Sequence, residues 1–71
     1  MWSFINKKVY SAAWKVFETR AGDKFKDITN AEMNIYYEHS HTYWVFVGFR
    51  LKNCVTNDAF YLDRNTLEPL C

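Results

Sequence analysis

The chain has 71 residues, 49% of them hydrophobic and 20% aromatic, and its nine Lys and Arg against eight Asp and Glu give a formal net charge of +1. A chain this short forms one domain, residues 1–71, near the lower size limit for folding without a metal, a disulfide or a partner. The near-neutral charge attracts neither a polyanion nor an anionic membrane, and a composition with only two Gly and one Pro excludes a disordered chain.

The N-terminal residues are apolar only briefly, because Asn6, Lys7 and Lys8 follow the first five. A secretory signal peptide begins with positive charge and has a longer apolar core, and no segment approaches the roughly 20 apolar residues of a membrane span. We therefore expect a soluble, cytoplasmic protein with no membrane partner. In a reducing cytoplasm Cys54 and Cys71 would be free thiols, although the sequence leaves their redox state open.

Residues 6–21 have the spacing of an amphipathic helix. At about 100° per residue, the apolar side chains gather on one wide arc and most charged ones on the other. Gly22 supplies the left-handed conformation that commonly ends a helix, and Arg20 in the last turn suits the negative end of the helix dipole. The sequence therefore predicts a helix that ends at Ala21, followed by a charged connector at 23–27.

Residues 29–38 carry two conflicting patterns. Thr29 and Glu32 have the spacing of a helix-capping box, whereas apolar and polar residues alternate from 31 to 38 as in a half-buried strand. We favour the strand, but the sequence alone does not decide between strand and helix.

The most apolar stretch of the chain is 42–51, which is rich in β-branched and aromatic residues. Such a composition is typical of a central strand that is covered on both faces. The polar residues 38–41 are expected to form a hairpin connection into this strand. Gly48, in the middle of the strand, is expected to mark a bulge or a close backbone approach.

Turn-forming residues dominate 52–58, so we expect a long turn there. A third strand is predicted at 59–62. It is followed by a turn at 63–66 and by a tail at 67–71 that can fold back over the edge of the sheet.

A helix followed by three antiparallel strands gives an α+β fold, a two-layer sandwich of one N-terminal helix packed on a β-meander. This order of elements, with the ending Tyr61-Leu62-Asp63-Arg64-Asn65-Thr66, resembles small PepSY-like domains. The resemblance concerns the pattern of elements and implies no function.

Strand alternation divides the residues of the sheet into two faces. The face suited to the helix is expected to hold Met33, Ile35, Tyr37, Tyr43, Val45, Val47, Phe49, Phe60 and Leu62. The second face would hold Tyr36, Trp44, Phe46 and Tyr61, together with Glu32, Glu38, Arg50 and Lys52. Each aromatic side chain can bury on the order of 150–250 Å², so this face approaches the few hundred Å² that a monomer normally exposes. A register slip of one residue would exchange the two faces.

Three kinds of cover for the second face are compatible with the sequence. The chain could cover it with Trp2, Phe4, Ile5, Leu67 and Leu70. Another protein, or a second copy of this one, could bind with the four aromatics as buried anchors and with Arg50 and Lys52 as rim charges. Single-stranded nucleic acid could stack on the same rings, but the neutral charge and the lack of an aromatic-and-glycine RNA-binding motif argue against it.

No group of residues predicts catalysis or a cofactor. His39 and His41 would point to one side of an extended chain, but two ligands do not make a metal site. Ser40 would face away from both histidines, and the acidic residues are scattered. A chain this small also has little room for a pocket of the roughly 300–1,000 Å³ that small-molecule sites occupy. We therefore expect a protein that is not an enzyme and that holds no metal and no cofactor.

The sequence thus predicts a small protein-protein interaction module that acts by stoichiometric binding. Its size and composition suit an inhibitor, an immunity-type protein or a phage- or plasmid-borne modulator of a host protein. The alternative is a single-stranded nucleic-acid-binding protein that uses the same aromatics with Arg50 and Lys52. The sequence does not name the partner or the oligomeric state, and a homodimer is one possibility.

Overall fold

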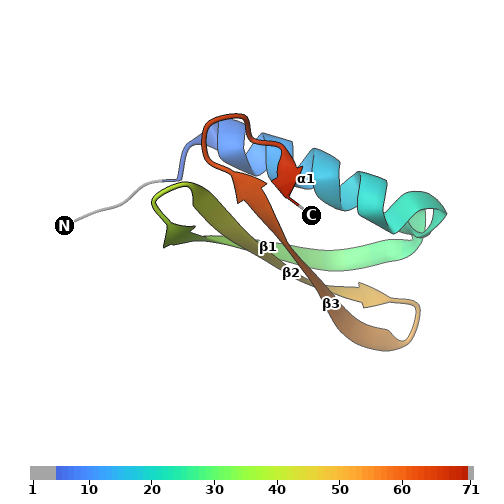
Figure 1. Ribbon diagram of the computed structural model, residues 1–71. Coiled ribbons are helices and arrows are strands. Elements are labelled where there is room, and N and C mark those ends of the chain that lie inside the picture. Colours follow the sequence, from blue (N-terminus) through green and yellow to red (C-terminus); the bar gives the residue numbers. More distant parts are fainter. Residues whose placement is uncertain (1–4, 71) are drawn as a thin grey trace.

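The computed structural model describes residues 5–70, with the side chain of His39 excepted. One helix packs on one face of an antiparallel sheet (Figure 1), which confirms the predicted α+β arrangement. The elements are α1 (Lys7–Ala21), a 3₁₀ turn η1 (Gly22–Asp27), β1 (Ile28–His39), β2 (Thr42–Leu51), β3 (Cys54–Asp63) and β4 (Pro69–Leu70). The strand order is β1-β2-β3-β4, a three-stranded meander extended by one short strand. Trp2, Phe4 and Cys71, for which the sequence left a core or cover role and a redox state open, lie outside the described residues.

Helix α1 begins and ends at residue types that favour helix ends. The side-chain oxygen of Asn6 accepts a hydrogen bond from the backbone N–H of Lys8 at 2.8 Å, which satisfies one of the free donors of the first turn. Gly22 ends the helix with φ 60° and ψ −134°, a conformation that residues with a Cβ rarely adopt. Within residues 5–70 no helix is both long enough and apolar enough to cross a membrane.

Residues 29–38, which carry both a helix pattern and a strand pattern, lie within the strand β1. The alternating pattern therefore outweighs the capping-box spacing. β1 pairs antiparallel with β2 and places Ile35 in the core, where it is 7% exposed. The charged connector before it is the 3₁₀ turn η1. Its one aromatic residue, Phe25, packs edge-on against Phe17 of α1, with ring centroids 6.0 Å apart.

A β-bulge interrupts β1 near its start. Two residues of β1, Asn30 and Ala31, lie opposite a single residue of β2, Phe49. Asn30 adopts φ 55°, a left-handed conformation that asparagine tolerates better than most residues. The irregularity that was expected at Gly48 therefore lies beside it, on the partner strand. A Cβ added at Gly48 would meet only the ring of Phe46, at 4.0 Å, so no close backbone approach requires this glycine.

Strand β3 is longer than the sequence suggested. It pairs with β2 without a register shift, from Cys54 opposite Leu51 to Asp63 opposite Thr42. The long turn predicted at 52–58 is therefore wrong beyond residue 53. β2 offers backbone hydrogen-bonding groups along its whole length, and pairing with them outweighs the turn preference of the polar residues that follow.

The tail returns along the edge of β3, as expected. The Asp63 carboxylate accepts a hydrogen bond from the backbone N–H of Asn65 at 2.7 Å and so starts the turn. Leu67, with φ 62°, then donates its N–H to the Asp63 carbonyl at 2.8 Å. β4 follows, with Leu70 opposite Tyr61.

The core lies between α1 and the sheet. Its buried residues are Val9, Ala13, Phe17, Ile35, Tyr43, Val45, Val47, Phe60 and Leu62. The helix contributes the first three, at a spacing of four residues, which forms one apolar stripe. Met33 and Phe49, predicted on the same sheet face, pack against this core and are partly buried. Tyr37 lies on this face as predicted, opposite Tyr43, but it is 43% exposed, and the guanidinium of Arg64 lies 4.6 Å from its ring centroid.

Candidate functional site

Four aromatic residues lie together on the face of the sheet that points away from α1. Tyr36 of β1 pairs with Trp44 of β2, and Trp44 pairs with Tyr61 of β3. Residues directly opposite one another in a sheet share a face, and Phe46, two residues after Trp44, shares it too. We call Tyr36, Trp44, Phe46 and Tyr61 the aromatic face.

Three of these rings form a continuous array. The ring centroids of Tyr36 and Trp44 are 5.5 Å apart with planes inclined by 32°, and those of Trp44 and Phe46 are 5.7 Å apart with planes inclined by 33°. Each such pair contributes about 0.5–1.5 kcal/mol beyond its buried area. The rings therefore hold one another in position, and a partner that binds them loses little free energy in ordering them.

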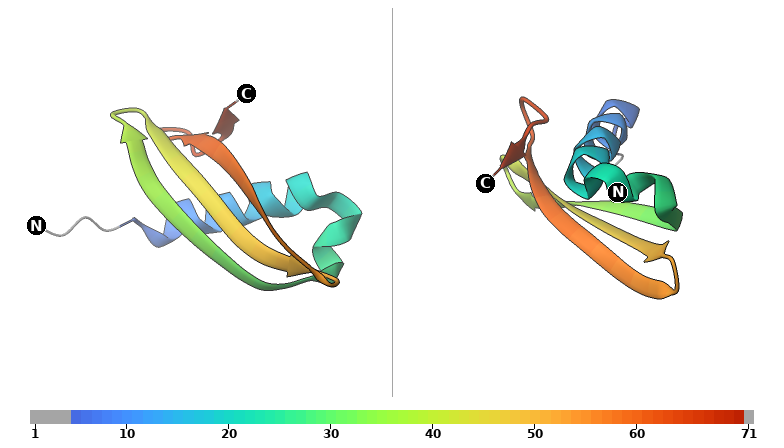
Figure 2. Two further views of the ribbon diagram at one scale, coloured as in Figure 1. Left: turned by 90° about the horizontal axis from the view of Figure 1, so that it is seen from below. Right: turned by 90° about the vertical axis from the view of Figure 1, so that its right-hand side faces the viewer.

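The aromatic face is accessible. Tyr36 is 50% exposed and Tyr61 is 42% exposed, while Trp44 and Phe46 are partly exposed. The left panel of Figure 2 looks onto this side of the sheet: α1 lies behind the strands, and no segment of residues 5–70 crosses in front of them.

Two of the five residues proposed as an intramolecular cover, Ile5 and Leu67, lie elsewhere. Ile5 and Leu67 pack against the core between α1 and the sheet, so that part of the expectation is wrong. Leu70 is 43% exposed, lies in register with Tyr61 at the sheet edge and lines a hollow together with Val16 and Thr19 of α1. Trp2 and Phe4 are outside the described residues.

The two predicted rim charges are distant from the rings. Arg50 is four residues from Phe46 and six from Trp44 along β2, which is about 13 and 20 Å at roughly 3.3 Å per residue. Lys52 lies beyond the end of β2, in the turn to β3, with φ 58°. In register with Phe46 are instead the uncharged residues Asn34 and Ala59. The two residues paired directly with Phe46 are therefore uncharged, and Glu32 lies one same-face position further along, opposite Gly48.

An arginine clamp, for which no local sequence pattern exists, fixes the end of the sheet that carries the aromatic face. The guanidinium carbon of Arg64 lies 4.6 Å from the ring centroid of Tyr37 and 5.3 Å from that of Tyr43. Its Nη1 donates a hydrogen bond to the carbonyl of Ser40 at 3.0 Å, and its backbone N–H donates one to the carbonyl of His41 at 2.9 Å. The turn between β3 and β4 is thereby tied to the turn between β1 and β2.

The aromatic face offers contact area and ring stacking. Among residues 5–70, no three His, Cys, Asp or Glu side chains are grouped so that they could hold a metal ion. Cys54 is an exposed free thiol at the start of β3, at the far end of the sheet from the rings.

No protein-family model matches the chain, and comparison with curated proteins and with solved structures gives no match either. The resemblance to PepSY-like domains therefore concerns the order of elements alone.

Proposed function

We propose that this protein is a protein-protein interaction module that binds its partner through the aromatic face and acts by occluding the surface it binds. The observation that supports the proposal is the ordered array of Tyr36, Trp44 and Phe46, which no described segment covers (Figure 2). Tyrosine and tryptophan dominate the residues that carry binding energy in protein interfaces. An inhibitor, an immunity-type protein and a modulator of a host protein would all use such occlusion.

The surroundings of the rings favour a polypeptide over a nucleic acid. Proteins that stack single-stranded bases on aromatic side chains also line the path of the backbone with cations. Here the cations Arg50 and Lys52 stand far from Trp44, and the net charge of the chain is +1. A protein surface needs no such cations, since stacking contacts and apolar burial carry most of its binding energy.

A second copy of the chain is the simplest partner. A two-fold symmetric contact would bring two identical aromatic faces together, so that each covers the other. A different protein with an apolar patch of matching shape is the other possible partner, and the two possibilities differ in what the isolated protein does in solution.

The decisive experiment is sedimentation equilibrium of the wild type, Trp44→Glu and Val55→Glu across a micromolar concentration series. Val55 is a matched control, because it is 76% exposed and lies on the same side of the sheet, opposite Arg50 and away from the rings. A wild-type dimer that Trp44→Glu converts to a folded monomer, and that Val55→Glu leaves intact, would identify a second copy as the partner.

If the wild type stays monomeric, the next experiment looks for a different protein as the partner. Immobilised wild type and immobilised Val55→Glu should then retain from a cell extract at least one protein that Trp44→Glu does not retain, and retention should change little with salt. Retention that falls steeply with salt and is replaced by single-stranded oligonucleotide would favour the nucleic-acid alternative. The proposal fails if the wild type is monomeric and all three proteins retain the same set.

A further inference from the structure

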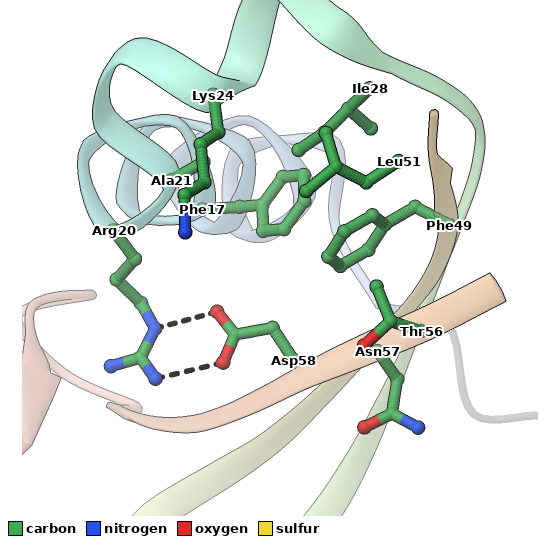
Figure 3. Close-up of a pocket in the computed structure, with 10 residues that line it drawn as sticks. All are labelled: Phe17, Arg20, Ala21, Lys24, Ile28, Phe49, Leu51, Thr56, Asn57 and Asp58. Carbon is green, nitrogen blue, oxygen red and sulfur yellow. Dashed lines mark hydrogen bonds and ion pairs between the residues drawn. The ribbon is translucent and has the colours of Figure 1, made fainter. Parts of the chain in front are cut away.

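A groove opens on the other side of the sheet, between the end of α1 and the β2–β3 hairpin (Figure 3). Its volume is about 540 Å³, which lies within the roughly 300–1,000 Å³ of small-molecule sites. The length of the chain suggested little room for such a space. The groove exists because the sheet twists, so that the hairpin diverges from the helix toward its tip (Figure 1).

The floor of the groove is apolar. Ile28, Phe49 and Leu51 line it and are only partly buried, and Phe17 closes it from the helix side (Figure 3). The rings of Phe17 and Phe49 are in contact, with centroids 5.3 Å apart. A ligand with an apolar body would remove the remaining surface of these side chains from water, which favours binding.

One wall of the groove is an ion pair that is already satisfied. The Nε and Nη2 atoms of Arg20 donate to the two carboxylate oxygens of Asp58 at 2.7 and 2.8 Å (Figure 3). The carboxylate also accepts the backbone N–H of Ala59 at 3.0 Å, and the guanidinium lies 5.3 Å from the centroid of the Phe60 ring. These contacts hold the pair rigidly and leave it with no net charge to offer a ligand.

Lys24 supplies a positive charge that is not compensated in this way. It lines the groove from η1, and its side chain runs down the helix side of the groove in Figure 3. Within the described part of the chain it has no hydrogen bond or ion pair. Across the groove stands Thr56, which is polar and uncharged, whereas the side chain of Asn57 points away from the groove (Figure 3). An apolar floor beside one unpaired cation is complementary to an anion with an apolar body.

We propose that this groove binds a small amphipathic carboxylate, with its aromatic or short acyl body on Ile28, Phe49 and Leu51 and its carboxylate beside Lys24. Thr56 can donate a further hydrogen bond to the carboxylate from the opposite wall. Because the groove is open and holds one cation, the expected dissociation constant for a ligand of a dozen heavy atoms is about 0.1–1 mM. This site is separate from the aromatic face and does not depend on the function proposed for it.

The experiment is a titration of the ¹⁵N-labelled full chain with 4-phenylbutyrate, followed by amide chemical shifts. The uncharged 4-phenylbutan-1-ol has the same apolar body and is titrated in parallel. We expect saturable shifts at the amides of Leu51, Thr56 and Asn57 with both compounds, and an affinity for the acid about two- to fivefold higher than for the alcohol, as one exposed charge pair contributes.

Two lysine variants separate the charge of Lys24 from the charge of the surrounding surface. Lys24→Gln should lower the affinity for the acid to that for the alcohol and leave the alcohol unchanged. Lys26→Gln is the matched control, because Lys26 lies in the same turn and does not line the groove. Both substitutions are at exposed positions, so both variants should keep the wild-type amide spectrum apart from local shifts.

Three results would overturn the proposal. The first is the absence of saturable shifts up to the solubility limit of the acid. The second is a set of shifts centred on Tyr36, Trp44 and Tyr61 instead of on the groove. The third is an acid-to-alcohol affinity ratio that Lys24→Gln and Lys26→Gln change equally. Trp44→Glu should leave binding of the acid unchanged, so failure of this proposal and failure of the aromatic-face proposal can be told apart.

Discussion

Tyr36 and Trp44 oppose each other directly across β1 and β2, and their rings touch on the side of the sheet away from the helix, with centroids 5.5 Å apart. The contact is independent of the core, since neither residue is among the buried set. The contact therefore orders the two rings of the aromatic face before any partner binds.

The contact predicts a measurable coupling between the two side chains. In a double-mutant cycle of Tyr36→Ala and Trp44→Ala, the free energies of unfolding should be non-additive by about 0.5–1.5 kcal/mol. The measurement is urea unfolding at a protein concentration where the chain is monomeric. The control cycle combines Tyr36→Ala with Val55→Ala, which share no contact, and should be additive to within about 0.5 kcal/mol. Additivity in the first cycle would show that the rings do not touch in solution.

Two leucines in the C-terminal half of the chain should differ sharply in their contribution to stability. Leu62 is 0% exposed in the core, whereas Leu70 is 43% exposed at the sheet edge. Leu62→Ala should lower the free energy of unfolding by about 2–5 kcal/mol, through lost burial and the cavity left behind. Leu70→Ala should change it by about 0.5 kcal/mol or less. Equal effects in urea unfolding would contradict the placement of the core.

The sequence predicted well those segments in which a single helix or strand pattern is present and no second pattern competes with it. Residues 6–21 and 42–51 each repeat a single period, and the core side of β2 follows from its alternation. The aromatic face was predicted because β2 and β3 pair without a register shift, so alternation carries across both strands. The strand at 54–58 was missed because its polar residues resemble a turn, and only pairing with β2 makes them extended.

The groove and the arginine clamp were beyond the reach of sequence patterns for a different reason. The groove results from the twist of the sheet away from α1, which depends on no particular residue. The clamp joins Arg64 to Ser40, 24 positions earlier in the chain, by a contact between two turns. Local periodicity contains no information about either relationship. The same holds for the ion pair of Arg20 with Asp58, which are 38 positions apart.

The two glycines should respond oppositely to substitution by alanine. Gly22 has φ 60° and ψ −134°, where a Cβ is strained although space is free around it, so Gly22→Ala should cost about 1–3 kcal/mol of stability. Gly48 lies in a strand, and an added Cβ meets only the Phe46 ring at 4.0 Å. Gly48→Ala should therefore be neutral or stabilise by up to about 1 kcal/mol, since alanine loses less backbone entropy on folding. Thermal unfolding of both variants beside the wild type measures the difference, and a destabilised Gly48→Ala would point to a tighter site than the structure shows.

The ion pair between Arg20 and Asp58 predicts how stability depends on pH. Hydrogen bonds from the Arg20 side chain, aided by its charge and opposed by partial burial, hold the pKa of the Asp58 carboxyl below its usual range. Because the folded-state pKa is lowered, the unfolded chain binds the proton more readily. The pair therefore stabilises the fold fully above the ordinary aspartate pKa of about 3.9, and this stability is lost as the pH falls through the folded-state pKa.

The size of the effect is limited by solvent, since the two side chains are 45% and 24% exposed. We expect Asp58→Asn to lower the free energy of unfolding at pH 7 by about 1 kcal/mol or less, and to reduce its decline below about pH 4. Arg20→Gln should remove the same part of the acid dependence, and the double variant should lose no more of that dependence than either single variant. Urea unfolding at pH 3 and pH 7, in low and high salt, measures this. An acid dependence that is unchanged in both single variants would show that the two side chains are not paired in solution.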